Sequence, residues 1–343
     1  MVYKMIEIIK KGAPQYKANL HCHSTLSDGN LTPEELKAAY KAHGYSILAI
    51  TDHEHPVDHS GMTEPDFLML TGYEGYIRQN PNGVYDRYKP EVHINLFARD
   101  PHNTAFVCYN EKYCKYIKDE RELASLVKVG SQRPREYTPE YVNEYVRTAR
   151  ENGYICAHNH AYWSMEDWEQ IAAYEGFFSM EMCNYSSYVA NHIEYNAQLY
   201  DWLLRRGKRW YCHSTDDNHN KHPLDSPDCD SFGGFTMILA DRLEYGSVFS
   251  ALEDGRFYSS MGPMIRALTV DGRSVHIETD PAVYIGMYDG GKLMHRAVGT
   301  ADSPVTTADF VIPDAARYIR FSVADADGRH ADTRAFTLAE LGI

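Results

Sequence analysis

The residues in this chain best suited to chemistry are a pair of closely spaced histidines followed by a carboxylate. His21 and His23 stand one residue apart after the apolar Leu20, and Asp28 follows five residues later. If the lead-in is a strand, both imidazoles point to the same side, because strand side chains alternate between faces. Two neutral imidazole nitrogens on one side can bind one divalent metal. A lone His-x-His pair is a weak signal of a metal site, so further candidate ligands elsewhere in the chain are needed to support one.

The same order, an apolar run followed by a His, Asp or Glu, recurs in five later segments. They are Thr51-Asp52-His53, Glu74, His93, the His158 and His160 pair, and Asp217-Asn218-His219. Independent buried histidines would not be expected to keep falling at the ends of strands. A shared pocket that holds more than one metal explains all of these segments together.

Helix and strand signals surround these segments in a repeating order. Thr32-Pro33-Glu34-Glu35 predicts a capped helix that ends at Gly44, and Tyr45–Ile50 predicts a buried strand before His53. The same order predicts two further units along the chain. These are a helix from Pro139 to Gly153 before strand Tyr154–Ala157, and a helix from Ile193 to Gly207 before strand Arg209–Cys212.

Alternating strands and helices predict an α/β fold with a parallel sheet. Candidate ligands follow several strands, which favours a closed β/α barrel over an open doubly wound sheet with its single switch point. The segment Lys112–Arg135 is expected to be a surface insertion with solvated charges.

The character of the sequence changes after the join Gly255–Pro263. Fourteen of the 17 histidines precede residue 223, and the tail predicts short strands with Asp271-Gly272 and Asp289-Gly290 as hairpin turns. The predicted strands are Ile265–Val270, Ser274–Glu278, Ala282–Met287, Arg317–Val323 and Arg334–Leu338. We therefore predict a barrel domain over residues 1–262 and a small antiparallel β domain over residues 263–343.

Composition narrows the possible partners and location. Thirty-four Lys and Arg against 48 Asp and Glu give a net charge of −14, which repels a long nucleic acid but not a small phosphorylated substrate held by metals. No apolar run approaches a membrane span or a signal peptide, so a cytoplasmic protein with no membrane partner is expected. The seven cysteines lack a Cys-x-x-Cys pair, which argues against a zinc finger or a disulfide framework. The oligomeric state stays open.

With these motifs assembled, the chain resembles the PHP (polymerase and histidinol phosphatase) superfamily of metal-dependent phosphoesterases. His21-Cys22-His23 with Asp28-Gly29 is similar to the first family motif, Thr51-Asp52-His53 to the second, and Asp217-Asn218-His219 to the last. Gly72-Tyr73-Glu74 and His93 resemble the middle motifs, and Gly255–Pro263 resembles the join found in the stand-alone branch named after the carbaryl hydrolases. The resemblance covers about residues 17–263 and implies a distorted (β/α)7 barrel with up to three metals.

The resemblance also implies how the ligands are shared among two or three divalent transition metals. One metal would take His21, His23, Glu74 and Asp217, and a second would share Glu74 and add His93 and a histidine of the 158–160 segment. A third would take Asp28, His53 and His219. Mixed imidazole and carboxylate ligands suit zinc, manganese or iron.

One motif departs from the family pattern, which usually reads Asn-His-Pro before an aromatic residue. This chain has Asn159-His160-Ala161, with Tyr162, Trp163 and Ser164 next. Alignment on Asn-His and Trp-Ser makes His160 the ligand, although His158 lies nearer the strand and stays open. Tyr162 and Trp163 are candidate pocket walls.

Several metals that share carboxylates can lower the pKa of a bridging water and neutralise phosphate oxygens. We therefore predict a hydrolase that cleaves small phosphate esters, monoesters or small diesters, by a hydroxide that bridges the metals. Asp28, His53 and His219 are the candidates to protonate the leaving group. Hydrolysis of a carbamate or carboxylic ester at the same centre is the alternative, and a non-catalytic metal-stabilised binding module is the alternative from another class.

Overall fold

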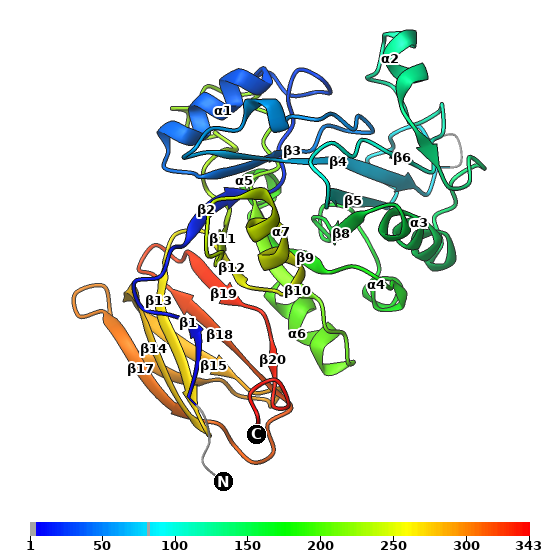
Figure 1. Ribbon diagram of the computed structural model, residues 1–343. Helices are drawn as coiled ribbons and strands as arrows, with labels where there is room; N and C mark the ends of the chain where they lie inside the picture. The colour runs from blue at the N-terminus through cyan, green and yellow to red at the C-terminus, as the bar shows by residue number, and fades with distance from the viewer. Residues whose placement is uncertain (1–4, 81–82) are drawn as a thin grey trace.

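The larger part of the chain is built around seven strands that lie side by side in chain order (Figure 1). This computed structural model describes residues 5–80 and 83–343. The strands are β2 (Tyr16–Asn19), β3 (Ile47–Ile50), β4 (Leu68–Arg78), β5 (Glu91–Ala98), β8 (Tyr154–His158), β9 (Ser179–Asn184) and β10 (Tyr211–Thr215). Every residue of β3, β4 except Arg78, β5, β8 and β9 is buried. Strand β3 is apolar throughout, as expected of a strand covered on both faces, whereas β5 and β9 also bury polar residues such as His93 and Glu181.

The prediction of an α/β fold with a distorted barrel and an antiparallel C-terminal sheet is confirmed, but two of its details are wrong. Strand β5 runs antiparallel to both β4 and β8, so the sheet is mixed. The barrel is also not closed by a strand ladder, because the free edge of β2 pairs with β11 (Phe235–Ile238) instead of β10. The two edges meet only beyond the strands, where Asp217 N–H donates to His21 O at 2.8 Å and His23 N–H donates to Asn218 O at 3.0 Å.

The predicted helices form, with one shift in position. Helix α1 (Pro33–Ala42) carries the expected capping box, in which Thr32 and Glu35 exchange hydrogen bonds, and α3 (Pro139–Glu151) begins after the cap Thr138. Helix α6 (Ala197–Arg205) begins four residues later than predicted, because Tyr195 bridges to Cys183 and the Asn196 N–H bonds Met182 O.

The other elements of this region are short. They are η1 (Ser60–Met62), β6 (Phe106–Val107), α2 (Glu120–Ser125), β7 (Lys128–Val129), α4 (Trp168–Ala173), α5 (Tyr185–Asn191) and α7 (Tyr245–Glu253). No helix within residues 5–80 and 83–343 combines the length and the apolar character needed to cross a bilayer.

The C-terminal region consists of antiparallel strands that lie on one side of the barrel (Figure 1). They are β12 (Phe257–Ser260), β13 (Ile265–Asp271), β14 (Ser274–Ala282), β15 (Tyr284–Tyr288), β16 (His295–Val298), β17 (Val305–Val311), β18 (Tyr318–Ala324), β19 (His330–Thr333) and β20 (Phe336–Thr337). The N-terminal strand β1 (Ile6–Ile9) joins this region by pairing with β13. The large sheet continues from β11 through β12 to β19, so the division at residue 262 stays a prediction.

Two parts of the sequence differ from expectation in this structure. The predicted strand Arg334–Leu338 is reduced to β20, and β16, β17 and β19 were not predicted. The segment Lys112–Arg135 is not only a solvated surface, because Arg135 is 3% exposed and forms a buried ion pair with Glu54.

Candidate metal centre

The structure brings all nine predicted ligands into one cluster at a single end of the barrel strands. The members come from six segments: His21, His23 and Asp28 after β2, His53 after β3, Glu74 in β4, His93 in β5, His160 after β8, and Asp217 and His219 after β10. Within the described residues these side chains form four overlapping groups whose ligand atoms lie close enough to surround metal ions. Their role as ligands stays a prediction, and so do the number and identity of the metals.

One of the two fully buried groups joins His21, His23 and Asp217. The Nε2 atoms of the two histidines lie 3.2 Å apart, and Asp217 Oδ1 lies 3.1 Å from His21 Nε2 and 2.9 Å from His23 Nε2. Ligand atoms bound at about 2.0–2.1 Å around a tetrahedral metal are roughly 3.3 Å apart. The three atoms therefore have the mutual spacing of a coordination shell.

Glu74 stands between two of the groups. Its Oε1 lies 3.0 Å from His93 Nδ1, 3.2 Å from His21 Nε2 and 3.5 Å from His160 Nε2. Its Oε2 lies 2.7 Å from His53 Nδ1. Because different imidazoles surround each of its oxygens, this carboxylate is in a position to bridge two metals.

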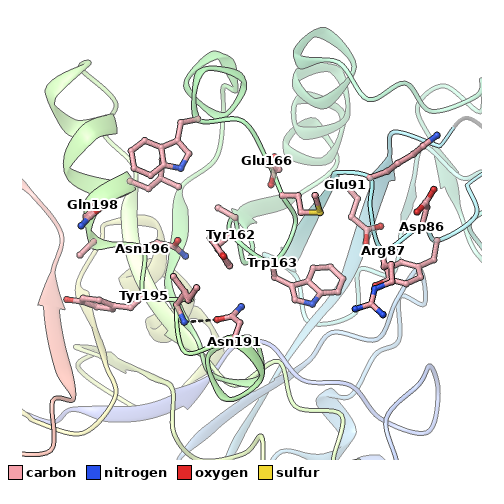
Figure 2. A pocket seen from close by; sticks show the side chains of 18 residues that line it. Asp86, Arg87, Glu91, Tyr162, Trp163, Glu166, Asn191, Tyr195, Asn196 and Gln198 are labelled. Atoms are coloured by element: carbon pink, nitrogen blue, oxygen red, sulfur yellow. Dashed lines mark hydrogen bonds between the residues drawn. The ribbon is translucent and has the colours of Figure 1, made fainter.

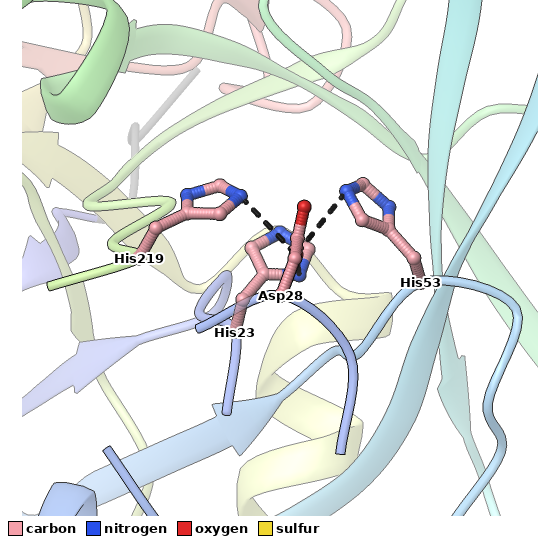
Figure 3. Close-up of side chains that lie close together, drawn as sticks. All are labelled: His23, Asp28, His53 and His219. Carbon is pink, nitrogen blue, oxygen red and sulfur yellow. Dashed lines mark ion pairs between the residues drawn. The ribbon is translucent and has the colours of Figure 1, made fainter. Parts of the chain in front are cut away.

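The remaining group is more open to solvent. Asp28 Oδ1 lies 3.5 Å from His219 Nε2, 3.8 Å from His53 Nε2 and 3.9 Å from His23 Nδ1. Figure 3 shows the three imidazoles arranged around this carboxylate. The Asp28 side chain is 34% exposed, so this side of the cluster is open to solvent.

Buried atoms without hydrogen bonds indicate that the cluster suits cations. His53 Nδ1, Glu74 Oε2 and Asp217 Oδ1 are all buried, and none makes a well-aligned hydrogen bond, although His53 Nδ1 and Glu74 Oε2 face each other at 2.7 Å. A buried polar atom left unpaired costs about 1–3 kcal/mol, more when it is charged. Metal ions at the centre would satisfy these atoms, and the donor set of imidazoles and carboxylates fits zinc, manganese or iron.

His158 and His160, either of which the sequence allowed as the ligand, have different surroundings in the structure. His160 Nε2 faces Glu74 and lies 3.7 Å from Asp217 Oδ2, whereas His158 points away and bonds Glu166 at 2.9 Å. His158 also lies among the rings of Tyr174, Phe177 and Trp210. The geometry therefore favours His160 as the ligand.

A second layer of polar residues holds the ring orientations. His21 Nδ1 donates to Glu181 Oε1 at 2.8 Å, because a carboxylate can only accept, and this leaves His21 Nε2 with a free lone pair. His219 Nδ1 likewise donates to the Asp217 carbonyl at 2.9 Å, and the Asn159 amide donates to Glu74 Oε1 at 2.6 Å.

Glu181 was missed by the sequence analysis. It lies in β9 between Met180 and Met182, and a lone carboxylate inside such an apolar strand was the available signal. Asp216, next to Asp217 in the chain, accepts the N–H groups of Phe232, Gly233 and Gly234 and so holds that loop.

The electrostatics of the cluster follow from its carboxylates. Burial alone would lower the pKa of His93, yet Glu74 and Glu91 raise that pKa to about 10. Burial alone would raise the pKa of Glu74, yet His93, His21 and His53 hold it well below its usual range. The field that increases proton affinity at the imidazoles also attracts divalent cations, so protons and metals compete for these nitrogens.

A cleft of ≈ 450 Å³ opens onto the cluster and has basic side chains in its lining. These are Arg78, Lys115 and Lys221, which the sequence could not place. Arg78 is held by Glu91 at 2.5 Å, and Lys115 comes from the segment that was expected to be a plain surface insertion. The cleft therefore has cations beside the proposed metals.

Comparison with known proteins gives similarities of limited extent. No family model matches the sequence. A segment of 118 residues is 53% identical to the 5'-3' exoribonuclease of Haemophilus influenzae, covering 32% of this chain and 41% of that protein. The chain thus spans less than half the length of this curated relative.

Two solved structures are similar over larger parts of the chain. One is a two-domain protein from Bacteroides vulgatus that contains a predicted PHP-like metal-dependent phosphoesterase, with a TM-score of 0.46 and 13% identity over 96% of this chain and 98% of that one. The other is an amidohydrolase from Chromobacterium violaceum with bound sulfate and no metal, with a TM-score of 0.41 and 17% identity over 70% of this chain and 96% of that one. The branch of the carbaryl hydrolases stays a prediction.

Proposed function

We propose that the chain is a PHP-type metal-dependent hydrolase that cleaves small phosphate esters. The observation that carries this proposal is the position of Glu74. Its Oε1 and Oε2 face separate sets of imidazoles, and Oε2 is buried without a well-aligned hydrogen bond. A structural metal site is normally closed around one four-coordinate ion, whereas this cluster shares a carboxylate and opens into a cleft.

Different residues of the chain would bind the substrate and transfer the proton. Metals bound at the cluster would supply a water of lowered pKa as nucleophile and would neutralise phosphoryl oxygens. Arg78, Lys115 and Lys221 line the same cleft and would attract the anionic ester. Asp28, His53 and His219 face the open side, which makes them the candidates to protonate the leaving alcohol.

A short oligonucleotide is the second candidate substrate. The segment shared with the exoribonuclease of Haemophilus influenzae favours a phosphodiester at a chain end. The net charge of −14 opposes a long nucleic acid, so a small monoester or diester remains the first choice.

The test is a panel of phosphomonoesters, small phosphodiesters, short oligoribonucleotides and carbamates, assayed with and without chelator. We expect turnover of small phosphate esters that chelator abolishes and added metal restores, with two or three metals per chain by elemental analysis. Turnover that survives complete metal removal would refute the mechanism. Reaction with carbamates or carboxylic esters alone would be consistent with the metal centre but would refute phosphate esters as the substrate class.

A further inference from the structure

A second and larger groove lies directly beside the metal cleft. It has a volume of ≈ 1120 Å³, and its lining includes the segment around Tyr162 and the start of α6 (Figure 2). Tyr85 and Trp163 line both the groove and the metal cleft. A molecule with its phosphate at the metal cleft could therefore extend past Tyr85 and Trp163 into the groove.

The largest apolar side chains of the groove are aromatic and unusually exposed. Tyr162 is 51% exposed and Trp168 is 42% exposed, and Tyr85 and Trp163 add two further rings to the lining. Exposed aromatic side chains gathered in the lining of one groove mark a binding site more often than a bare surface. Flat rings in the lining favour a flat ligand, because aromatic groups stack face to face or edge to face.

Trp163 forms the boundary between the two spaces. Its ring lies 5.0 Å from the ring of His160 and 5.6 Å from that of His93, nearly perpendicular to both, and 6.5 Å from the nearly parallel ring of Tyr85. Figure 2 shows Trp163 between the Tyr162 side of the groove and the side formed by Arg87 and Glu91. The same indole therefore touches the metal ligands and lines the groove.

The backbone of Tyr162 and Trp163 is fixed by a buried carboxylate. The carboxylate of Glu194, which is fully buried, accepts the backbone N–H of Tyr162 at 3.1 Å and that of Trp163 at 2.7 Å. A polar group buried in this way and fully hydrogen-bonded fixes its partners in one arrangement. The aromatic surface is thus organised before any ligand arrives.

The C-terminal region supports the opposite wall. Tyr195 lines the groove and donates its hydroxyl to Asp332 at 2.7 Å, and Asp332 in turn pairs with the buried Arg320. Arg320 also holds Asp201 of α6 at 2.7 Å. The β region therefore has a part in shaping the groove.

We propose that this groove binds a flat aromatic group carried by the ester alcohol, so that the preferred substrates are phosphate esters of aromatic alcohols. This inference rests on the proposed function, because it places the phosphate at the metal centre. The groove determines which alcohol is accepted, whereas the metal centre determines which bond is cleaved.

The experiment compares benzyl phosphate with cyclohexylmethyl phosphate. Both release a primary alcohol and the two groups are similar in size, so a difference in kcat/KM reports on recognition of the ring. We expect a preference of roughly tenfold for benzyl phosphate, the value of a good aromatic contact. Tyr85→Leu, at the boundary of the cleft and the groove, and Tyr162→Leu keep an apolar side chain but remove the flat face, and each should erase most of this preference.

Leu293→Ala, at a site 83% exposed in the β15–β16 hairpin, is the matched control and should keep the preference. Equal kcat/KM values for the two esters, or a preference unchanged in both groove variants, would overturn the inference.

Calorimetric binding of benzylphosphonate and methylphosphonate separates this inference from the proposed function. If no ester is hydrolysed but benzylphosphonate binds more tightly and Tyr85→Leu removes the difference, the groove is supported and the hydrolase proposal fails. If esters are hydrolysed and the two phosphonates bind alike, the groove proposal fails alone.

Discussion

The Nδ1–H of His21 donates a hydrogen bond to Glu181 Oε1 at 2.8 Å, and the opposite nitrogen of the ring faces Asp217 and Glu74. Glu181 also accepts the backbone N–H of His160 at 2.7 Å through Oε2. One carboxylate that was not itself predicted as a ligand therefore orients two histidines that were.

Replacement of this carboxylate should weaken metal binding without removing a ligand. Glu181→Gln keeps the shape but loses the charge that supports the His21 ring, and such outer partners are worth about 10–100-fold in metal affinity. Competition with a chelator of known affinity measures the change. Glu244→Gln, at an exposed helix cap, should have no effect, and an unchanged affinity in Glu181→Gln would contradict this role.

Loss of Glu74 should be more harmful than loss of His53. Glu74 and His53 each belong to two of the ligand groups, but the Glu74 carboxylate faces imidazoles of three histidines through Oε1 and of a fourth through Oε2, so Glu74→Gln removes a charge shared by two sites. We expect activity to fall on the order of a thousandfold, or about 4 kcal/mol of transition-state stabilisation. His53→Ala should cost less, because the more open group keeps Asp28 and His219. Steady-state rates and metal counts of both variants check this, and near-normal activity of Glu74→Gln would refute the bridging role.

The two histidines of the 158–160 segment should behave differently. His160→Ala removes a nitrogen that faces Glu74, so the variant should lose metal and activity. His158→Ala removes the partner of Glu166 in an aromatic environment, so it should lower the free energy of unfolding while keeping the metal content. Elemental analysis and urea unfolding of both variants distinguish the two effects. Metal loss in the His158 variant alone would reverse the assignment.

The buried pair of Glu54 and Arg135 provides a test of the fold around the centre. Arg135 Nη1 and Nη2 lie 2.6 Å and 2.7 Å from the two oxygens of Glu54, and the Glu54 N–H bonds the Glu74 carbonyl at 2.7 Å. Glu54→Gln leaves a buried guanidinium without its charge partner, which costs about 3–5 kcal/mol.

Adding Arg135→Met to Glu54→Gln should recover much of that loss, because the uncompensated charge is gone. Chemical unfolding of the two single variants and the double variant measures the coupling. Additive losses would show that the pair is not coupled.

The positions of the metal ligands could be predicted because each is marked locally, by a His or carboxylate directly after an apolar run. The roles of Glu181, Arg135 and Lys115 could not be predicted, since they depend on contacts with residues far away in the chain. Glu54 and Arg135, for example, are 81 positions apart. A charged residue in an insertion looks the same in sequence whether it faces water or a buried partner.

The sheet shows a similar limit. An apolar run predicts a buried strand, and β3, β5 and β8 are all buried. The run does not reveal direction, so antiparallel β5 was not predicted from its residues. The apolar run also does not reveal which strand pairs with the free edge of β2, because β10 and β11 are both short and largely buried.

His213 should make the stability of the fold depend on pH. Its ring is fully buried, Nδ1 lies 2.6 Å from Ser179 Oγ, and Nε2 has no hydrogen-bond partner. Burial lowers the pKa of His213 from 6.5 to about 4. Below about pH 6.5 the unfolded chain takes up a proton that the folded chain refuses until about pH 4, so stability falls as pH falls through this window.

Between about pH 7.5 and about pH 5, the titration of His213 should lower the free energy of unfolding by about 2 kcal/mol. This loss should be absent in His213→Leu. Urea unfolding of both proteins at the two pH values, with chelator present throughout, removes the separate pH dependence of metal binding. Wild type should lose more free energy of unfolding than the variant over this range. An equal loss in both proteins, or a larger loss in the variant, would show that His213 is not held neutral by burial.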